Sequence, residues 1–336
     1  MNAAPDLAAA EAVEAAAPEL LRVEGLSVSL PGGVALVDGV SLTIHKGERV
    51  ALVGESGSGK SVTAQAVLRL NDRLRVDGRV MLDGRDILSL SEREMAGVRG
   101  GRIGLAFQDA MVCLDPIMTV GDQIEESLRI RGVGRAEARR RAIAILTELG
   151  VHDAADRLGS YVHEFSGGMR QRVVLAMALV AQPDLLIADE PTTALDVRVQ
   201  RQVLDLLDQF AANHALSVLL ITHDMGIVAS FADRVVVMYS GRIVEDASVF
   251  DLFERPLHPY TQGLLAAIPR VDRSQDELAA VPGSPVPPAL RPSGCAFHPR
   301  CAKATEVCRT EVPPLETMGG RRVACHHPAT DGVHAL

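Results

Sequence analysis

The spacing of apolar and polar residues along the chain predicts strands that alternate with helices. Apolar runs of strand length, bounded by turn residues, give way to stretches with apolar residues at three- and four-residue steps. We expect strands within 21–53 and at 76–82, 103–107, 185–188, 217–222 and 234–239, and helices from Lys60 and over 120–150, 173–181, 197–213 and 225–232. Alternation of this kind is typical of a parallel α/β sheet.

Glycine and proline residues set the expected turns and linkers. Turns are expected at Gly25, at 31–33 and at 46–47, and a hairpin over 76–82 with turns at Asp77-Gly78 and Asp83-Gly84. The proline-rich stretch 282–292 predicts an extended linker that leads to a small terminal module.

The net charge and the distribution of apolar residues argue against several classes of protein. A formal net charge of −9 over 336 residues argues against a nucleic-acid backbone as the main ligand, because such binding needs a basic face. Residues 1–18 lack the basic start and apolar core of a secretory signal. The longest apolar stretch, Val173–Ala181, has nine residues, whereas a membrane-spanning helix needs about 20. Any link to a membrane is therefore expected to run through a partner.

A phosphate-binding loop follows the apolar run 49–53. The stretch 54–61 fits the pattern GxxxxGK[ST], in which backbone N–H groups and a helix N-terminus face the phosphates. Lys60 would bring a positive charge and Ser61 a magnesium ligand. The candidate nucleotide-binding residues are Gly54, Glu55, Ser56, Gly57, Ser58, Gly59, Lys60, Ser61 and Val62. The alternative is a chance match in an ordinary loop.

The apolar run 185–188 ends in two acidic residues. Asp189 would hold magnesium and Glu190 would orient the attacking water, which suffices because phosphoryl transfer needs mainly positioning and charge neutralisation. The alternative is an exposed acidic strand end without a function.

A second phosphate-binding segment is expected at 166–172. Its small residues, Ser166-Gly167-Gly168, would leave backbone N–H groups accessible at the start of the helix 173–181. One rigid chain cannot easily bring both segments to the same γ-phosphate. The sequence therefore predicts a sandwich of two chains with ATP between them.

In this order and spacing the motifs resemble the ATP-binding subunit of ATP-binding cassette (ABC) transporters. The resemblance rests on the loop 54–61, Gln108, the signature 166–172, Asp189-Glu190, the D-loop 194–196 and His223. It implies a P-loop NTPase fold of the ABC type, with a RecA-like core, an antiparallel β subdomain and a helical subdomain at about 109–180. We expect a disordered tail over 1–19, the ATPase domain over 20–250 and a C-terminal extension over 251–336.

The same resemblance implies a role for each matching residue. The catalytic residues would be Glu190, His223 and Gln108, and the magnesium ligands Ser61, Gln108 and Asp189. Further nucleotide contacts would come from Gln108, Asp189, Ser166, Gly167, Gly168, Met169 and Asp196. Gln108 would also link the ATP site to a transmembrane partner. Where the family places an aromatic residue on adenine, this chain has Leu30 or another aliphatic residue, so we expect weaker base discrimination.

Several stretches resemble dipeptide and oligopeptide importer ATPases in particular. They are 169–172, the segment 108–116 with Ala110, Cys113 and Asp115 as substitutions, and the carboxyl-terminal stretches 256–261, 268–269, 282–287 and 294–301. The extension also holds Cys295, Cys301, Cys308 and Cys325, which are separated by five, six and sixteen residues.

Four cysteines so close together suggest metal ligation, because disulfides are rare in a reducing cytoplasm. Four thiolates suit a [4Fe–4S] cluster, and some relatives in the peptide-importer family are similar here. Zinc, assisted by His298, His326 or His327, and four thiols without a metal are the alternatives.

The resemblance implies an ATP hydrolase that energises import of dipeptides or oligopeptides at the cytoplasmic face of the bacterial inner membrane. Its implied partners are a second ATPase subunit, expected to be a different sibling chain, two transmembrane permeases and, indirectly, a solute-binding protein, with no nucleic acid. The alternatives are an exporter, a nickel, opine or glycoside importer, and a soluble ABC ATPase of DNA repair or translation. A further alternative makes the cysteine module a redox or iron sensor that gates transport.

Overall fold

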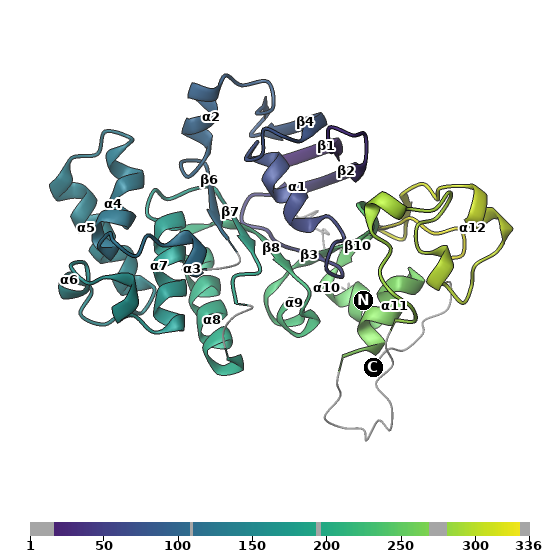
Figure 1. Ribbon diagram of the computed structural model, residues 1–336. Helices are drawn as coiled ribbons and strands as arrows, with labels where there is room; N and C mark the ends of the chain where they lie inside the picture. The colour runs from purple at the N-terminus through teal and green to yellow at the C-terminus, as the bar shows by residue number, and fades with distance from the viewer. Residues whose placement is uncertain (1–16, 108–109, 193–195, 269–280, 330–336) are drawn as a thin grey trace, which may run out of the picture.

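A mixed sheet runs through the centre of the molecule, and the helical part and the C-terminal extension lie at its opposite ends (Figure 1). The computed structural model describes residues 17–107, 110–192, 196–268 and 281–329. The strand order is β11 (Glu316–Met318), β12 (Arg321–Val323), β10 (Arg242–Ser248), β9 (Arg234–Tyr239), β3 (Arg49–Val53), β8 (Ser217–Thr222), β7 (Leu185–Asp189) and β6 (Ile103–Ala106).

The strands from β9 to β6 are parallel, as the alternating pattern predicted. Every residue of β7 and β8 is buried, which is the usual state of parallel strands covered on both faces. Val53 at the end of β3 is in register with Thr222, and Asp189 is in register with Ile221. The loops that follow β3, β7 and β8 therefore meet at the carboxyl ends of the strands, where α/β sheets bind ligands.

A second, antiparallel sheet has the order β2 (Ala35–His45), β1 (Glu19–Ser29), β4 (Arg75–Leu82) and β5 (Arg85–Asp86). The prediction of turns at Gly25 and at Asp77-Gly78 is wrong, because both positions lie inside strands. Gly25 has a φ of 58° and Gly78 a φ of 111°. The pairing of β1 with β4 shifts register between Glu24 and Ser27, beside both glycines. These glycines therefore permit a β-bulge in place of a turn.

The helices fill the remaining segments, with one long predicted helix divided in two. The segment 120–150 forms α4 and α5, which are separated at Gly132. The helices are α1 (Lys60–Val67), α2 (Glu92–Val98), α3 (Ala110–Cys113), α4 (Val120–Arg129), α5 (Arg135–Glu148), α6 (Ala154–Arg157), α7 (Gly167–Leu179), α8 (Val197–His214), α9 (Met225–Phe231), α10 (Val249–Glu254), α11 (Pro259–Ala266) and α12 (Glu306–Thr310), with 3-10 turns η1 (Val162–Glu164), η2 (Pro288–Leu290) and η3 (His298–Arg300). Within the described ranges, no helix combines the length and apolarity needed to cross a bilayer.

The C-terminal extension is joined to the sheet and is not a separate module. Its strand β12 pairs with β10, with Asp246 opposite Arg322. A single hydrophobic cluster contains Tyr239 of β9, Tyr260 of α11 and Phe297. The linker expected at 282–292 is packed as well, since η2 lies within it and Arg291 forms an ion pair with Asp38 of β2 at 2.9 Å.

Candidate functional site

The phosphate-binding loop makes a tight turn between β3 and α1. Gly54 has a φ of 154°, and a Cβ atom there would come within 2.2 Å of the Met238 carbonyl oxygen, so only glycine fits. Lys60 is buried, and its Nζ donates to the carbonyl oxygens of Gly54 at 2.7 Å and Glu55 at 3.0 Å. Burial lowers the pKa of Lys60, and the carboxylates of Glu190, Asp189 and Glu55 oppose that shift.

The predicted magnesium ligands Ser61 and Asp189 lie side by side. The Ser61 hydroxyl donates to Asp189 Oδ1 at 3.0 Å, across the gap between α1 and the end of β7. Burial raises the pKa of Asp189, while the Ser61 hydroxyl and Lys60 act in the other direction. A hydroxyl and a carboxylate oxygen at one point are the ligand types that Mg²⁺ prefers, so this pair fits the ion. The third predicted ligand, Gln108, lies outside the described residues.

Glu190 and His223 meet beside this pair. His223 Nδ1 lies 3.1 Å from Glu190 Oε1, and these residues follow the neighbouring strands β7 and β8. Glu190 has a φ of 46°, in the left-handed region that residues with a side chain rarely adopt. Such conformations cluster at functional sites. The contact with His223 thus orients the Glu190 carboxylate.

A cavity of about 540 Å³ lies between these groups, which is within the range of small-molecule sites. Its lining residues are Leu36, Ser56, Gly57, Ser58, Gly59, Lys60, Ser61, Val62, Glu190, His223 and Pro288. Leu30, the aliphatic residue suggested for the adenine position, is not among them, whereas Leu36 is. Pro288 was missed by the sequence analysis because it lies far along the chain, in a stretch expected to be a linker.

The signature residues lie away from this cavity. In the part of the chain that the structure describes, no residue from 166 to 172 lines it. The signature helix starts earlier than expected: α7 begins at Gly167, and Ser166 caps it by accepting from the Met169 N–H at 3.4 Å. Ser166 and Gly167 are exposed, and Gly168 lies against Val199 of α8. Asp196 caps α8, and its D-loop neighbours 194–195 lie outside the described residues.

The four cysteines of the extension line one small cavity, together with His258, His298, His326 and His327. Burial raises the pKa of Cys325 to about 11 and also raises the pKa values of Cys295 and Cys301. His258 is buried, which lowers its pKa to about 3, and its Nε2 has no hydrogen-bond partner. Across the ranges described, however, no group of three or more His, Cys, Asp or Glu side chains is placed to hold a metal ion.

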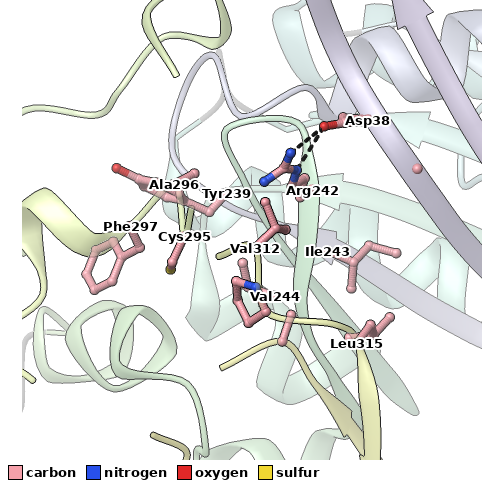
Figure 2. A pocket seen from close by; sticks show the side chains of 13 residues that line it. Asp38, Tyr239, Arg242, Ile243, Val244, Cys295, Ala296, Phe297, Val312 and Leu315 are labelled. Atoms are coloured by element: carbon pink, nitrogen blue, oxygen red, sulfur yellow. Dashed lines mark hydrogen bonds and ion pairs between the residues drawn. The ribbon is translucent and has the colours of Figure 1, made fainter. Parts of the chain in front are cut away.

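A further cavity of about 360 Å³ lies where β2, β10 and the extension meet (Figure 2). Arg242 points to Asp38 there, with 2.6 Å between Nη2 and Oδ2, and Phe297 and Cys295 approach from the extension. None of its lining residues belongs to the loop 54–61 or to the acidic pair. It is therefore distinct from the candidate nucleotide site.

The parallel sheet, the glycine loop around Lys60 and the acidic pair after β7 define a P-loop ATPase. The family model described as "ABC transporter" matches residues 37–193, and the model described as "Oligopeptide/dipeptide transporter, C-terminal region" matches residues 244–308. The oligopeptide transport ATP-binding protein AppD of Bacillus subtilis is 48% identical over 297 residues, covering 87% of this chain and 90% of AppD. The dipeptide transport ATP-binding protein DppD of Bacillus subtilis is 46% identical over 302 residues, covering 88% and 90%.

Among solved structures, the dimeric ATP-binding cassette MJ0796 bound to ADP and Pi is similar, with a TM-score of 0.61 and 26% identity over 68% of this chain and 99% of that chain. The chain belongs to the ATP-binding subunits of ABC transporters, in the group with the oligopeptide/dipeptide transporter C-terminal region. It is an ATP hydrolase. The family and fold class inferred from the motifs are confirmed.

Proposed function

We propose that MgATP binds in the cavity beside Lys60 and that Glu190 orients the attacking water. Lys60 and the N–H groups of the loop would hold the phosphates, and Ser61 and Asp189 would hold the magnesium ion, which neutralises phosphate charge. The contact between Glu190 and His223 at 3.1 Å carries this proposal, because it fixes a carboxylate at the cavity wall. Gln108 is assigned to the site from the family resemblance alone.

Two ATPase subunits would close head to tail on two ATP molecules. The start of α7, with the exposed Ser166 and Gly167 and the half-buried Gly168 and Met169, lies away from the chain's own cavity and would face the ATP of a second subunit. Asp196, which caps α8, would contact the same ATP. The dimeric form of the MJ0796 cassette supports this arrangement. The second subunit is a copy of this chain or a sibling ATPase.

The cycle would drive import of dipeptides or oligopeptides through two permease subunits, with this chain at the cytoplasmic face of the bacterial inner membrane. The match to the oligopeptide/dipeptide transporter C-terminal region and the names of DppD and AppD support this substrate class. A nickel, opine or glycoside importer is the alternative within the same family. Uptake of labelled dipeptides by cells with and without this chain distinguishes these substrates.

The substitution Glu190→Gln tests the assigned chemistry. The variant is expected to bind ATP like the wild type and to lose at least about 100-fold in kcat, because the amide cannot accept a proton from water. Glu148→Gln is a matched control, since Glu148 also pairs with a histidine, His214, at 2.7 Å. Its turnover should be unchanged. Normal turnover by Glu190→Gln would refute the role of Glu190.

We also propose that the four extension cysteines ligate a [4Fe–4S] cluster. The support is their common cavity and the unpartnered Nε2 of His258, which lines the same cavity and could donate a hydrogen bond to a sulfur atom. The thiols would lose their protons and close on the cluster as it binds, since metal binding and local folding are coupled. The cluster would fix the conformation of the extension.

Anaerobic purification followed by iron, sulfide and zinc analysis tests this assignment. About four iron and four sulfide per chain are expected, with loss of both in Cys308→Ser and retention in the control Cys113→Ser, which changes a cysteine of α3. Stoichiometric zinc, or no metal in the anaerobic protein, would contradict it.

A further inference from the structure

The C-terminal extension contacts the phosphate-binding loop directly. Arg300, which lies in η3 of the extension, forms a bidentate ion pair with Glu55 of the loop: Nη1 lies 2.6 Å from Oε2 and Nη2 lies 3.0 Å from Oε1. The hydroxyl of Tyr260, in α11, accepts from the Glu55 backbone N–H at 2.9 Å. The extension thus contacts both the carboxylate and the backbone N–H of this loop residue.

Arg300 is itself held rigidly. Its side chain is 4% exposed, and its Nε donates to the Pro282 carbonyl at 2.8 Å. The guanidinium lies over the rings of Tyr239 and Phe297, at 5.7 and 5.9 Å from their centroids. Those two rings pack edge to face at 5.2 Å. A bidentate contact from an arginine fixed in this way defines the position of its carboxylate partner.

Glu55 places a negative charge in a loop that binds anions. A phosphate-binding loop attracts negative charge through its N–H groups and lysine, and a carboxylate in the same loop opposes that attraction. The Glu55 carbonyl also accepts from Lys60 Nζ at 3.0 Å, so a change in the Glu55 peptide changes the position of that amine. Neutralisation and orientation of Glu55 should therefore raise the affinity for a triphosphate.

We propose that Arg300 and Tyr260 are positioning residues for ATP, which neutralise and orient Glu55 so that the affinity of the phosphate-binding loop for MgATP depends on the C-terminal extension. This inference rests on the ATP site proposed above and not on the identity of the transported solute. It gives the extension a part in nucleotide binding. The two residues act through Glu55 and need not touch the nucleotide.

The test measures the Kd for MgATP of the full-length subunit by calorimetry. Arg300→Gln should weaken binding about tenfold, because the Glu55 charge is no longer compensated. Arg300→Lys, which keeps the charge and loses the bidentate geometry, should weaken binding less. Glu55→Gln combined with Arg300→Gln should restore most of the affinity, since no uncompensated carboxylate remains. In steady-state turnover the single variant Arg300→Gln should raise KM with little change in kcat.

Two further variants make the result decisive. Arg309→Gln changes an exposed arginine of α12 in the same extension and should leave the Kd unchanged. Tyr260→Phe removes only the hydroxyl that accepts from the Glu55 N–H, and should raise the Kd severalfold even if Arg300→Gln fails to fold. An unchanged Kd in Arg300→Gln, or a double variant that binds no better than Arg300→Gln alone, would overturn the inference. Absence of ATP binding by the wild type would instead refute the proposed ATP site.

Discussion

At the scale of single residues, the wall of the nucleotide cavity is notable for its aliphatic and proline side chains. Leu36 lines the cavity from β2 and Pro288 from η2, and no Phe, Tyr or Trp side chain occurs among its lining residues in the described chain. Base stacking on an aromatic ring stabilises nucleotide binding by about 1–3 kcal/mol. An aliphatic wall gives contact area without that stacking. We therefore expect the affinity for ATP to owe more to the phosphates than to the base.

A substitution that adds a ring tests this expectation. Leu36→Tyr should tighten ATP binding about fivefold, because stacking contributes roughly 1 kcal/mol. Competition binding with ATP, GTP and triphosphate measures the affinity and the preference for the base. Leu30→Tyr is the matched control, since Leu30 is 42% exposed and does not line the cavity. A gain in Leu30→Tyr and none in Leu36→Tyr would place the base at Leu30.

The sequence was informative for residues that belong to local motifs. Lys60, Asp189, Glu190 and His223 were predicted to act together, and the parallel strands do bring them to the ends of β3, β7 and β8. Their roles remain predictions. Tyr260 and Arg300 lie in the stretches 256–261 and 294–301 that resemble importer ATPases, but their contact with Glu55 was not predicted, because they lie 205 and 245 residues from it. Contacts made only by tertiary packing leave no such signal in one sequence.

At the scale of secondary-structure elements, the sequence predicted parallel strands correctly, whereas its prediction for two glycine positions of the antiparallel sheet was wrong. Strands β8 and β9 have the predicted bounds, since buried parallel strands are continuous apolar runs. Gly25 and Asp77-Gly78 were predicted as turns, and they form a bulge instead. A glycine with positive φ serves equally in a turn and in a bulge. Only the pairing of β1 with β4, which is a long-range contact, decides between them.

The bulge makes a specific prediction about Gly78. A Cβ atom at Gly78 would lie 2.8 Å from the carbonyl oxygens of Glu24 and Gly25, so Gly78→Ala should lower the free energy of unfolding by about 2–3 kcal/mol. Gly84→Ala is the control: Gly84 has a φ of 78° with no atom near the added Cβ, so the loss should be about 1 kcal/mol. Urea unfolding monitored by circular dichroism compares them. Equal losses would mean that the close approach is relieved at no cost.

At the scale of the whole molecule, one buried carboxylate joins the central sheet, the antiparallel sheet and the extension. Asp246 of β10 is 4% exposed and accepts from Arg234 of β9 at 2.8 Å and from Arg322 Nε of β12 at 3.1 Å. Arg322 also donates to the Ser41 carbonyl of β2 at 3.2 Å. The proline-rich stretch 282–292 predicted a linker that leads to a terminal module. The network around Asp246 could not be predicted from the sequence, because its members come from four separate strands.

Removal of the Asp246 charge should therefore loosen the attachment of the extension as well as destabilise the fold. Asp246→Asn leaves Arg322 without its carboxylate and leaves Arg234 with Glu48 alone. Breaking a buried pair costs about 3–5 kcal/mol, so we expect a loss near the lower value. Asp205→Asn, which breaks an exposed pair with Arg201 on α8, should cost less than about 0.5 kcal/mol. Urea unfolding gives the energies, and hydrogen exchange should show faster opening of β12 in Asp246→Asn. If Asp246→Asn matched Asp205→Asn in both measurements, the Asp246 network would contribute nothing to the attachment of the extension. That attachment would then rest on the hydrophobic cluster of Tyr239, Tyr260 and Phe297 and on the other ion pairs of the extension, such as Arg291 with Asp38.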